Sequence, residues 1–114
     1  MAREKRERKR TVTPSSGNVF ADLGLADARE RQTKVRLAFA INRILEQRRL
    51  PQTKAARLLG INQPKISALS NYRLEGFSVE RLMHFLTALG QDVEIVIRSK
   101  PDSRHGARIV VRAA

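Results

Sequence analysis

Apolar residues repeat along the chain first with the period of a helix and later with the period of a strand. The helical pattern begins at Asp27 and runs to about Arg49. One face of a helical wheel drawn for this segment carries Leu37, Ala40, Ile41, Ile44 and Leu45. Val35 and Phe39 form a second apolar stripe, which we expect to be covered either by the apolar residues of segment 19–25 or by a second copy of the chain.

Two short helices are predicted in the middle of the chain. The first covers residues 52–59 and stops at Gly60. The second starts after Asn62, whose side chain is a good N-cap, and continues to about residue 71. Pro64 falls in the first turn of this helix, where its missing N–H has no intrahelical partner to lose.

A fourth helix is followed by a strand pattern. Ser78 caps the helix, Gly90 stops it, and its apolar stripe is Val79, Leu82, Met83, Leu86 and Leu89. After Gly90 the apolar period becomes two, which predicts a strand over 92–98, and residues 107–112 fit a second one. Because one or two strands do not form a stable sheet alone, this region either folds as a hairpin on the helices or pairs with the same strand of another subunit. The sequence thus predicts a mainly α fold with a C-terminal β-strand or hairpin.

The charge of the chain points to a polyanionic partner. Its 114 residues include 23 Lys and Arg against 11 Asp and Glu, a net charge of +12, and such an excess commonly serves to neutralise phosphates. Residues 1–18 combine a cluster of this charge with few apolar positions, so we expect a disordered basic arm there. Residues 19–90 then form the helical domain, and residues 91–114 form the strand region, which we interpret as a dimerisation element.

Several classes of protein are excluded by what the chain lacks. It is too short for a multi-domain enzyme, and without Cys it has no disulfide and no thiolate zinc site. His84 and His105 have no Asp or Glu at the helical spacing that would complete a three-ligand metal site, and Glu75 and Glu80 lack a pocket pattern, so we expect no enzyme activity, no metal and no cofactor. No apolar run approaches the ~20 residues that span a membrane, and we expect a cytoplasmic protein.

Residues 52–69 have the pattern of a helix-turn-helix. Ala55 and Ala56 are small enough for two helices to cross closely, and Gly60 tolerates the positive φ of a tight turn. The second helix packs inward through Ile61, Ile66 and Leu69, while its outward positions are Gln63, Pro64, Lys65, Ser67 and Ala68. An ordinary helical hairpin shares several of these features. The capped, mostly polar outer face and the net charge together favour a helix that enters the major groove of DNA.

The same segment resembles the helix-turn-helix of Cro and the phage repressors, the XRE type. The flanking sequence segments 16–25, 75–78, 81–83 and 86–93 are similar to those of an XRE subgroup that includes HigA-like antitoxins of type II toxin–antitoxin pairs. The resemblance implies a phage-repressor-like helix-turn-helix bundle. It also implies a transcriptional regulator that represses its own promoter, with an antitoxin role and a RelE-like toxin as partner.

Carried over by position, the resemblance implies a set of DNA-contacting residues. Gln52 would bond a phosphate or brace the next helix, and Gln63, Pro64 and Ala68 would face bases. Lys65 and Ser67 would contact phosphate, and the loop of Asn71, Tyr72 and Arg73 would follow the backbone. Thr53 and Asn62 complete the predicted set.

Partners follow from the size of the module. A single domain of this size binds DNA weakly, so we expect a homodimer on a short palindromic operator. RNA binding is an alternative because basic arms bind RNA too, but stacking platforms need aromatics and only Tyr72 is expected to be exposed. A third interpretation is an antitoxin that acts mainly by binding its toxin and reads little sequence.

Overall fold

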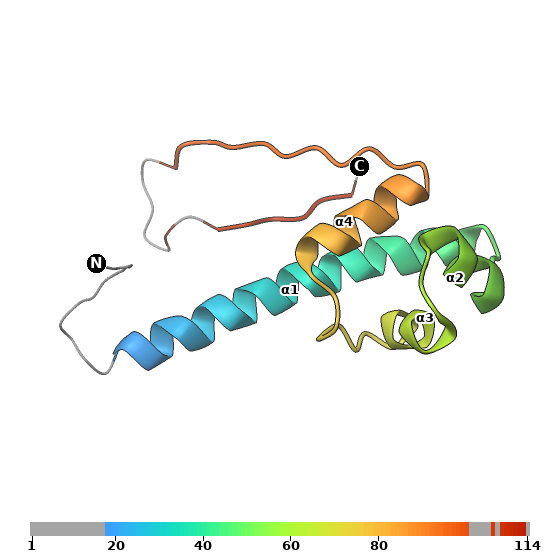
Figure 1. The fold of residues 1–114 in the computed structure, drawn as a ribbon. Coiled ribbons are helices and arrows are strands. Elements are labelled where there is room, and N and C mark those ends of the chain that lie inside the picture. Colours follow the sequence, from blue (N-terminus) through green and yellow to red (C-terminus); the bar gives the residue numbers. More distant parts are fainter. Residues whose placement is uncertain (1–17, 101–105, 107, 114) are drawn as a thin grey trace. The chain divides into compact units, whose positions relative to one another are not determined.

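The computed structural model describes residues 18–100, 106 and 108–113 (Figure 1). This part of the chain contains four helices, α1 (Asn18–Gln47), α2 (Gln52–Leu59), α3 (Gln63–Ser70) and α4 (Val79–Ala88). The chain divides into two compact units, residues 1–30 and 31–114. The second unit contains α1 from Arg31 onward together with α2, α3 and α4, and the packing described below belongs to it.

The predicted start of the first helix at Asp27 is wrong, because α1 already begins at Asn18. Segment 19–28 is rich in Ala and Leu, which favour helix, and Gly24 costs only about 1 kcal/mol relative to Ala. The segment that was one expected cover for Val35 and Phe39 is therefore part of the same helix. Those two side chains remain 40% and 56% exposed in the chain. Apart from Asn18, the predicted basic arm of residues 1–18 lies outside the described residues.

The three other predicted helices are confirmed within two residues at each end. Each is fixed by local chemistry at its termini. The Asn62 Oδ1 atom accepts from the backbone N–H of Lys65 at 2.9 Å, and Ser78 Oγ accepts from that of Arg81 at 3.0 Å. These two N-caps satisfy amides that have no partner inside their helices.

All four helices of the described residues end in the same way. In each, a residue one or two positions after the helix has a left-handed backbone, and the next amide donates to the carbonyl five residues back at 2.9 to 3.0 Å. The left-handed residues are Arg49, Gly60, Tyr72 and Gly90, with φ of 53°, 70°, 60° and 79°. Two of these ends use the glycines that the sequence predicted, while Arg49 and Tyr72 adopt the conformation at a steric cost of about 1 kcal/mol or more.

Replacing the left-handed glycine after α2 and introducing a glycine after α1 should change the free energy of unfolding in opposite directions. An added Cβ at Gly60 meets nothing within 4 Å, so Gly60→Ala tests backbone strain alone and should lower the free energy of unfolding by about 1 kcal/mol. Arg49→Gly relieves the same strain and should raise it by a few tenths of a kcal/mol. Urea unfolding of both variants measures this, and equal destabilisation by the two would contradict a strained Arg49.

The core of the second unit draws on every helix and on the α3–α4 loop. Its buried apolar residues are Leu37, Ala38, Ile41, Leu45, Ala55, Ala56, Leu59, Ile66, Leu69, Leu74, Phe77, Leu82, Phe85, Leu86 and Leu89. The predicted stripes of α1 and α4 are present, and the core adds residues such as Ala38 and Phe85 that the stripes did not include. The ring of Phe77 meets that of Phe85 edge-on, with centroids 5.8 Å apart. This aromatic pair joins the loop after α3 to α4.

The predicted C-terminal strand is not formed in the single chain. Within residues 91–100, 106 and 108–113 no strand occurs, and no backbone hydrogen bond follows that of Gln91 to Leu86. Val111 is half-buried against the core, but Ile95 and Ile97 are 73% and 92% exposed. The alternating pattern indicates a segment suited to a sheet edge, and such a segment needs a second strand to become a ladder.

Candidate nucleic-acid interface

Helices α2 and α3 form the predicted helix-turn-helix. Ala55 and Ala56 are 1% and 7% exposed, as expected for small residues where two helices approach closely. Gly60 has the left-handed backbone of the turn, and Ile66 and Leu69 are fully buried. The opposite face of α3 is thereby turned away from the core.

The first turn of α3 is the most exposed part of that face. Gln63 and Pro64 are exposed, and the Asn62 cap fixes the backbone that carries them. Pro64 occupies the first turn as predicted and leaves no amide unpaired there. The turn therefore presents one amide side chain and one rigid apolar ring to the surroundings.

Gln52 and Gln63 lie together across the start of the motif. The Nε2 group of Gln63 donates to Oε1 of Gln52 at 3.4 Å. A glutamine amide has two donors and an acceptor oxygen, so this bond leaves Gln63 one donor and its Oε1 atom free. Gln52, the first residue of α2, thus braces the Gln63 side chain of α3, which is one of the two roles predicted for it.

Lys65 is held against the α3–α4 loop. Its Nζ atom lies 3.4 Å from the Gly76 carbonyl oxygen and 5.1 Å from the centroid of the Phe77 ring. A Cβ atom on Gly76 would come within 2.9 Å of that ammonium, so the glycine leaves room for it. The predicted phosphate contact by Lys65 would use a half-buried ammonium that already has an aromatic and a carbonyl partner.

The other predicted residues divide into exposed and half-buried groups. Ser67 and Ala68 are half-buried, and Ala68 packs against the core rather than pointing fully outward. The exposed ones are Thr53, Asn71, Tyr72 and Arg73. Asn71 Nδ2 donates to the Ser67 carbonyl oxygen at 2.9 Å, so this side chain closes the end of α3.

Comparisons with known proteins agree with this geometry. A family model described as a helix-turn-helix domain matches residues 19–98. Among solved structures, one named as a candidate XRE family transcriptional regulator is 68% identical, with a TM-score of 0.74, and the match covers 77% of this chain and 99% of that one. The chain belongs to the XRE-type helix-turn-helix family. A comparison with curated proteins gives no match. The predicted XRE resemblance is thus confirmed, whereas the HigA-like subgroup stays a prediction.

Two hydrogen bonds that hold the helices of this XRE-type domain together could not be predicted from the sequence pattern. Asn42 Nδ2 donates to the Leu69 carbonyl oxygen at 3.1 Å, which joins α1 to the last turn of α3. A guanidinium nitrogen of Arg48 donates to the Leu89 carbonyl oxygen at 2.7 Å, which joins α1 to the end of α4. Both acceptors are backbone carbonyls at helix ends. The spacing of side chains along the sequence does not predict contacts of this kind.

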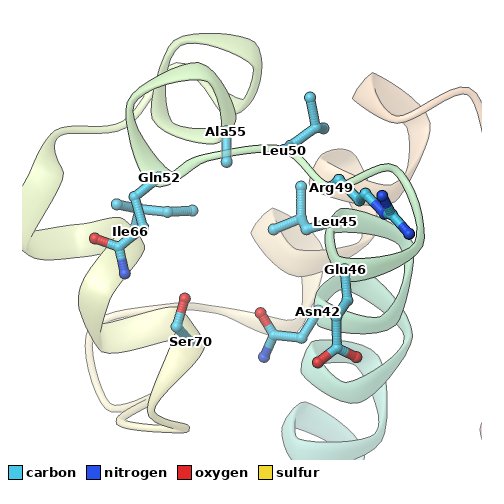
Figure 2. A pocket seen from close by; sticks show the side chains of 9 residues that line it. All are labelled: Asn42, Leu45, Glu46, Arg49, Leu50, Gln52, Ala55, Ile66 and Ser70. Atoms are coloured by element: carbon cyan, nitrogen blue, oxygen red, sulfur yellow. The ribbon is translucent and has the colours of Figure 1, made fainter.

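A shallow cleft of about 350 Å³ lies between α1 and the helix-turn-helix (Figure 2). Its apolar wall includes Leu45, Ala55 and Ile66, and Gln52 stands at its edge. The described residues contain no group of three or more His, Asp or Glu suited to a metal. Across the same residues, no helix is both long and apolar enough to cross a membrane.

The two side-chain caps of the XRE-type domain allow a matched pair of variants. Asn62→Ala and Ser78→Ala each remove one cap bond and should each lower the free energy of unfolding by about 1 kcal/mol. Only Asn62→Ala disturbs the first turn of α3, so it alone should also weaken binding to DNA beyond its effect on folding. Denaturant unfolding and DNA titration of both variants measure this, and equal DNA affinities would show that the cap has no part in binding.

Proposed function

We propose that this protein is a DNA-binding transcriptional regulator that reads its operator in the major groove with α3. The XRE-type fold and the net charge of +12 support this proposal. The observation that carries it is the bond between Gln52 and Gln63 at the exposed start of α3. A side chain that is already constrained loses less conformational freedom when it meets the groove, and this bond supplies such a constraint.

The free groups of Gln63 fit an adenine edge. Adenine presents the N7 acceptor beside the N6 amino donor in the major groove. Gln63 has one unused donor and its Oε1 acceptor, so both can engage that pair while the bond to Gln52 persists. Pro64 next to it offers only apolar contact, which suits the methyl group of a thymine.

The residues around α3 fit the sugar–phosphate backbone. Thr53 lies in the first turn of α2, and Asn71, Tyr72 and Arg73 follow the last turn of α3, so the two groups flank the base-facing positions. We propose that they fix the register of the helix on the duplex without reading sequence. Ser67 and Lys65 have smaller parts in this proposal because both are half-buried.

The operator is proposed to be a palindrome bound by a homodimer, with repression of the protein's own promoter as the outcome. Residues 19–90 form the reading domain, residues 91–114 the dimerisation element, and the basic residues 1–18 an arm that contacts phosphates. Selection of binding sites from randomised duplexes tests this. We expect an inverted repeat whose half-sites are about 10 base pairs apart. Recovery of unrelated sequences would contradict operator reading.

A second proposed role, as an antitoxin, is favoured by the exposed aromatic side chain of Phe39 on α1. Phe39 is 56% exposed and, with Arg43, Glu46, Gln47 and Tyr72, lines a hollow of about 360 Å³. An exposed aromatic ring beside such a hollow is suited to a protein partner, which we propose to be a RelE-like toxin. Co-expression with the product of the neighbouring gene tests this role. The wild-type chain should relieve the growth arrest caused by that gene product. The Phe39→Glu variant should fail to relieve it while still binding DNA.

A further inference from the structure

Among the described residues, the segment from Asp92 to Lys100 makes no backbone hydrogen bond and leaves Ile95, Val96 and Ile97 largely exposed. It forms no helix or strand, and after Gln91 the described residues have no backbone hydrogen bond. Val96 is 61% exposed and its neighbour Ile97 is 92% exposed. Alternating β-branched side chains along an unpaired backbone are the features of a strand edge that accepts a second strand.

The charges of this segment are arranged symmetrically about Val96. Glu94 and Arg98 stand two residues before and after it, and Asp92 and Lys100 stand four residues before and after it. All four charged side chains are exposed. In an antiparallel pair related by a two-fold axis at Val96, each acidic residue faces a basic residue of the other strand, because positions equally far from the axis oppose each other.

We infer that residues 92–100 of two copies of this chain pair as antiparallel strands with the two-fold axis at Val96. This inference rests on the homodimer of the proposed function and specifies its interface. Glu94 faces Arg98 of the second copy, Asp92 faces Lys100, and Ile95 faces Ile97. Opposite charges directly across a strand pair stabilise it, and the exposed isoleucines gain apolar neighbours.

Moving the two-fold axis by one residue, which shifts the register by two residues, gives a less complementary arrangement of charges. With the axis at Ile95, Asp92 would face Arg98, but Glu94 would face Val96 and Lys100 would extend beyond the paired segment. The Val96 register places each acidic residue opposite a basic one and Ile95 opposite Ile97, while Val93 faces Ser99. It also accounts for the absence of a strand in one chain, since the partner edge belongs to another molecule.

Single cysteines test the register directly, because the natural chain contains no Cys. Val96→Cys places two thiols directly opposite each other, within reach of a disulfide, whereas two Ile95→Cys thiols lie a diagonal position apart. In full-length protein without DNA, under mild oxidation, we expect Val96→Cys to form covalent dimers about tenfold faster than Ile95→Cys or Ile97→Cys alone. A mixture of the last two should cross-link as mixed dimers. Faster cross-linking of Ile95→Cys than of Val96→Cys, or none by any variant, would overturn the inference.

Charge reversal provides a second test. Glu94→Arg creates two like-charge contacts in the dimer, and so does Arg98→Glu, so each should raise the dimer dissociation constant roughly tenfold. The double variant E94R/R98E restores both contacts and should return the constant to near the wild-type value, which sedimentation equilibrium measures. A double variant as weak as the single ones would overturn the pairing. Cross-linking that follows the prediction while operator selection fails would refute the proposed function and leave this interface standing.

Discussion

Phe77→Ala is expected to lower the free energy of unfolding by about 3 to 5 kcal/mol, as large-to-small changes of buried aromatics do. Phe77 is 2% exposed and contacts Phe85 edge-on, so its loss leaves a cavity between the α3–α4 loop and α4. The change also removes the ring under the Lys65 ammonium. Equilibrium unfolding in urea, followed by circular dichroism, gives the value.

Two control variants separate the packing of Phe77 from its contact with Lys65. Phe77→Leu retains much of the volume and should cost less than the alanine variant. Lys65→Met keeps the ring and removes the ammonium together with its contacts to the ring and to the Gly76 carbonyl oxygen, which should cost about 1 kcal/mol or less. A loss below about 1 kcal/mol for Phe77→Ala would mean that this ring does not join the loop to the core.

Gln63→Ala is expected to weaken binding to the operator by about 1 to 3 kcal/mol, a factor of roughly 5 to 150, while binding to scrambled duplex stays unchanged. The side chain is exposed and makes no contact with the core, so folding should be unaffected. Fluorescence anisotropy with both duplexes measures the two affinities. The expected loss should be concentrated at one adenine–thymine pair of each half-site.

The control variants for Gln63 change an amide elsewhere. Gln52→Ala removes the brace but keeps the reading group, so its loss on operator should be smaller than that of Gln63→Ala. Gln32→Ala removes an exposed amide from α1, outside the helix-turn-helix, and should change neither affinity. A Gln63→Ala variant that loses the same factor on both duplexes would show that Gln63 supports general binding and reads no base.

The helices of the motif could be predicted from the sequence because their ends are decided locally. Each signal acts within a few residues of its own position. Asn62 and Ser78 cap helix N-termini, Gly60 forms a left-handed turn, and Pro64 lacks an amide that the first helical turn does not need. The start of α1 at Asn18 depends on a balance among many weak helix propensities along the segment. That is why its predicted boundary was nine residues too late.

The candidate site was predictable in its positions and less so in its contacts. Exposed Gln63 and its brace Gln52 followed from position in the motif. The environment of Lys65 did not, because Gly76 and Phe77 approach it only after the loop between α3 and α4 has folded. The half-buried state of Ala68 likewise depends on how tightly α3 packs on the core.

The C-terminal region shows a different limit. The alternation of Val93, Ile95 and Ile97 describes which side chains share a face, but a strand also requires hydrogen bonds to a neighbour. No such neighbour is present among the described residues of one chain. A pattern of this kind therefore predicts strand-forming capacity, and the partner strand decides whether the strand exists.

Measuring DNA binding over a series of salt concentrations is the sharpest test of operator reading by α3. Full-length protein is titrated with its own upstream DNA, with a scrambled duplex of the same length and with duplex RNA, at increasing salt. We expect binding to the upstream DNA to remain tight and selective at physiological salt, while binding to the other two falls steeply because it rests on counterion release alone. Equal and equally salt-sensitive binding to all three would contradict a regulator that reads DNA sequence with α3.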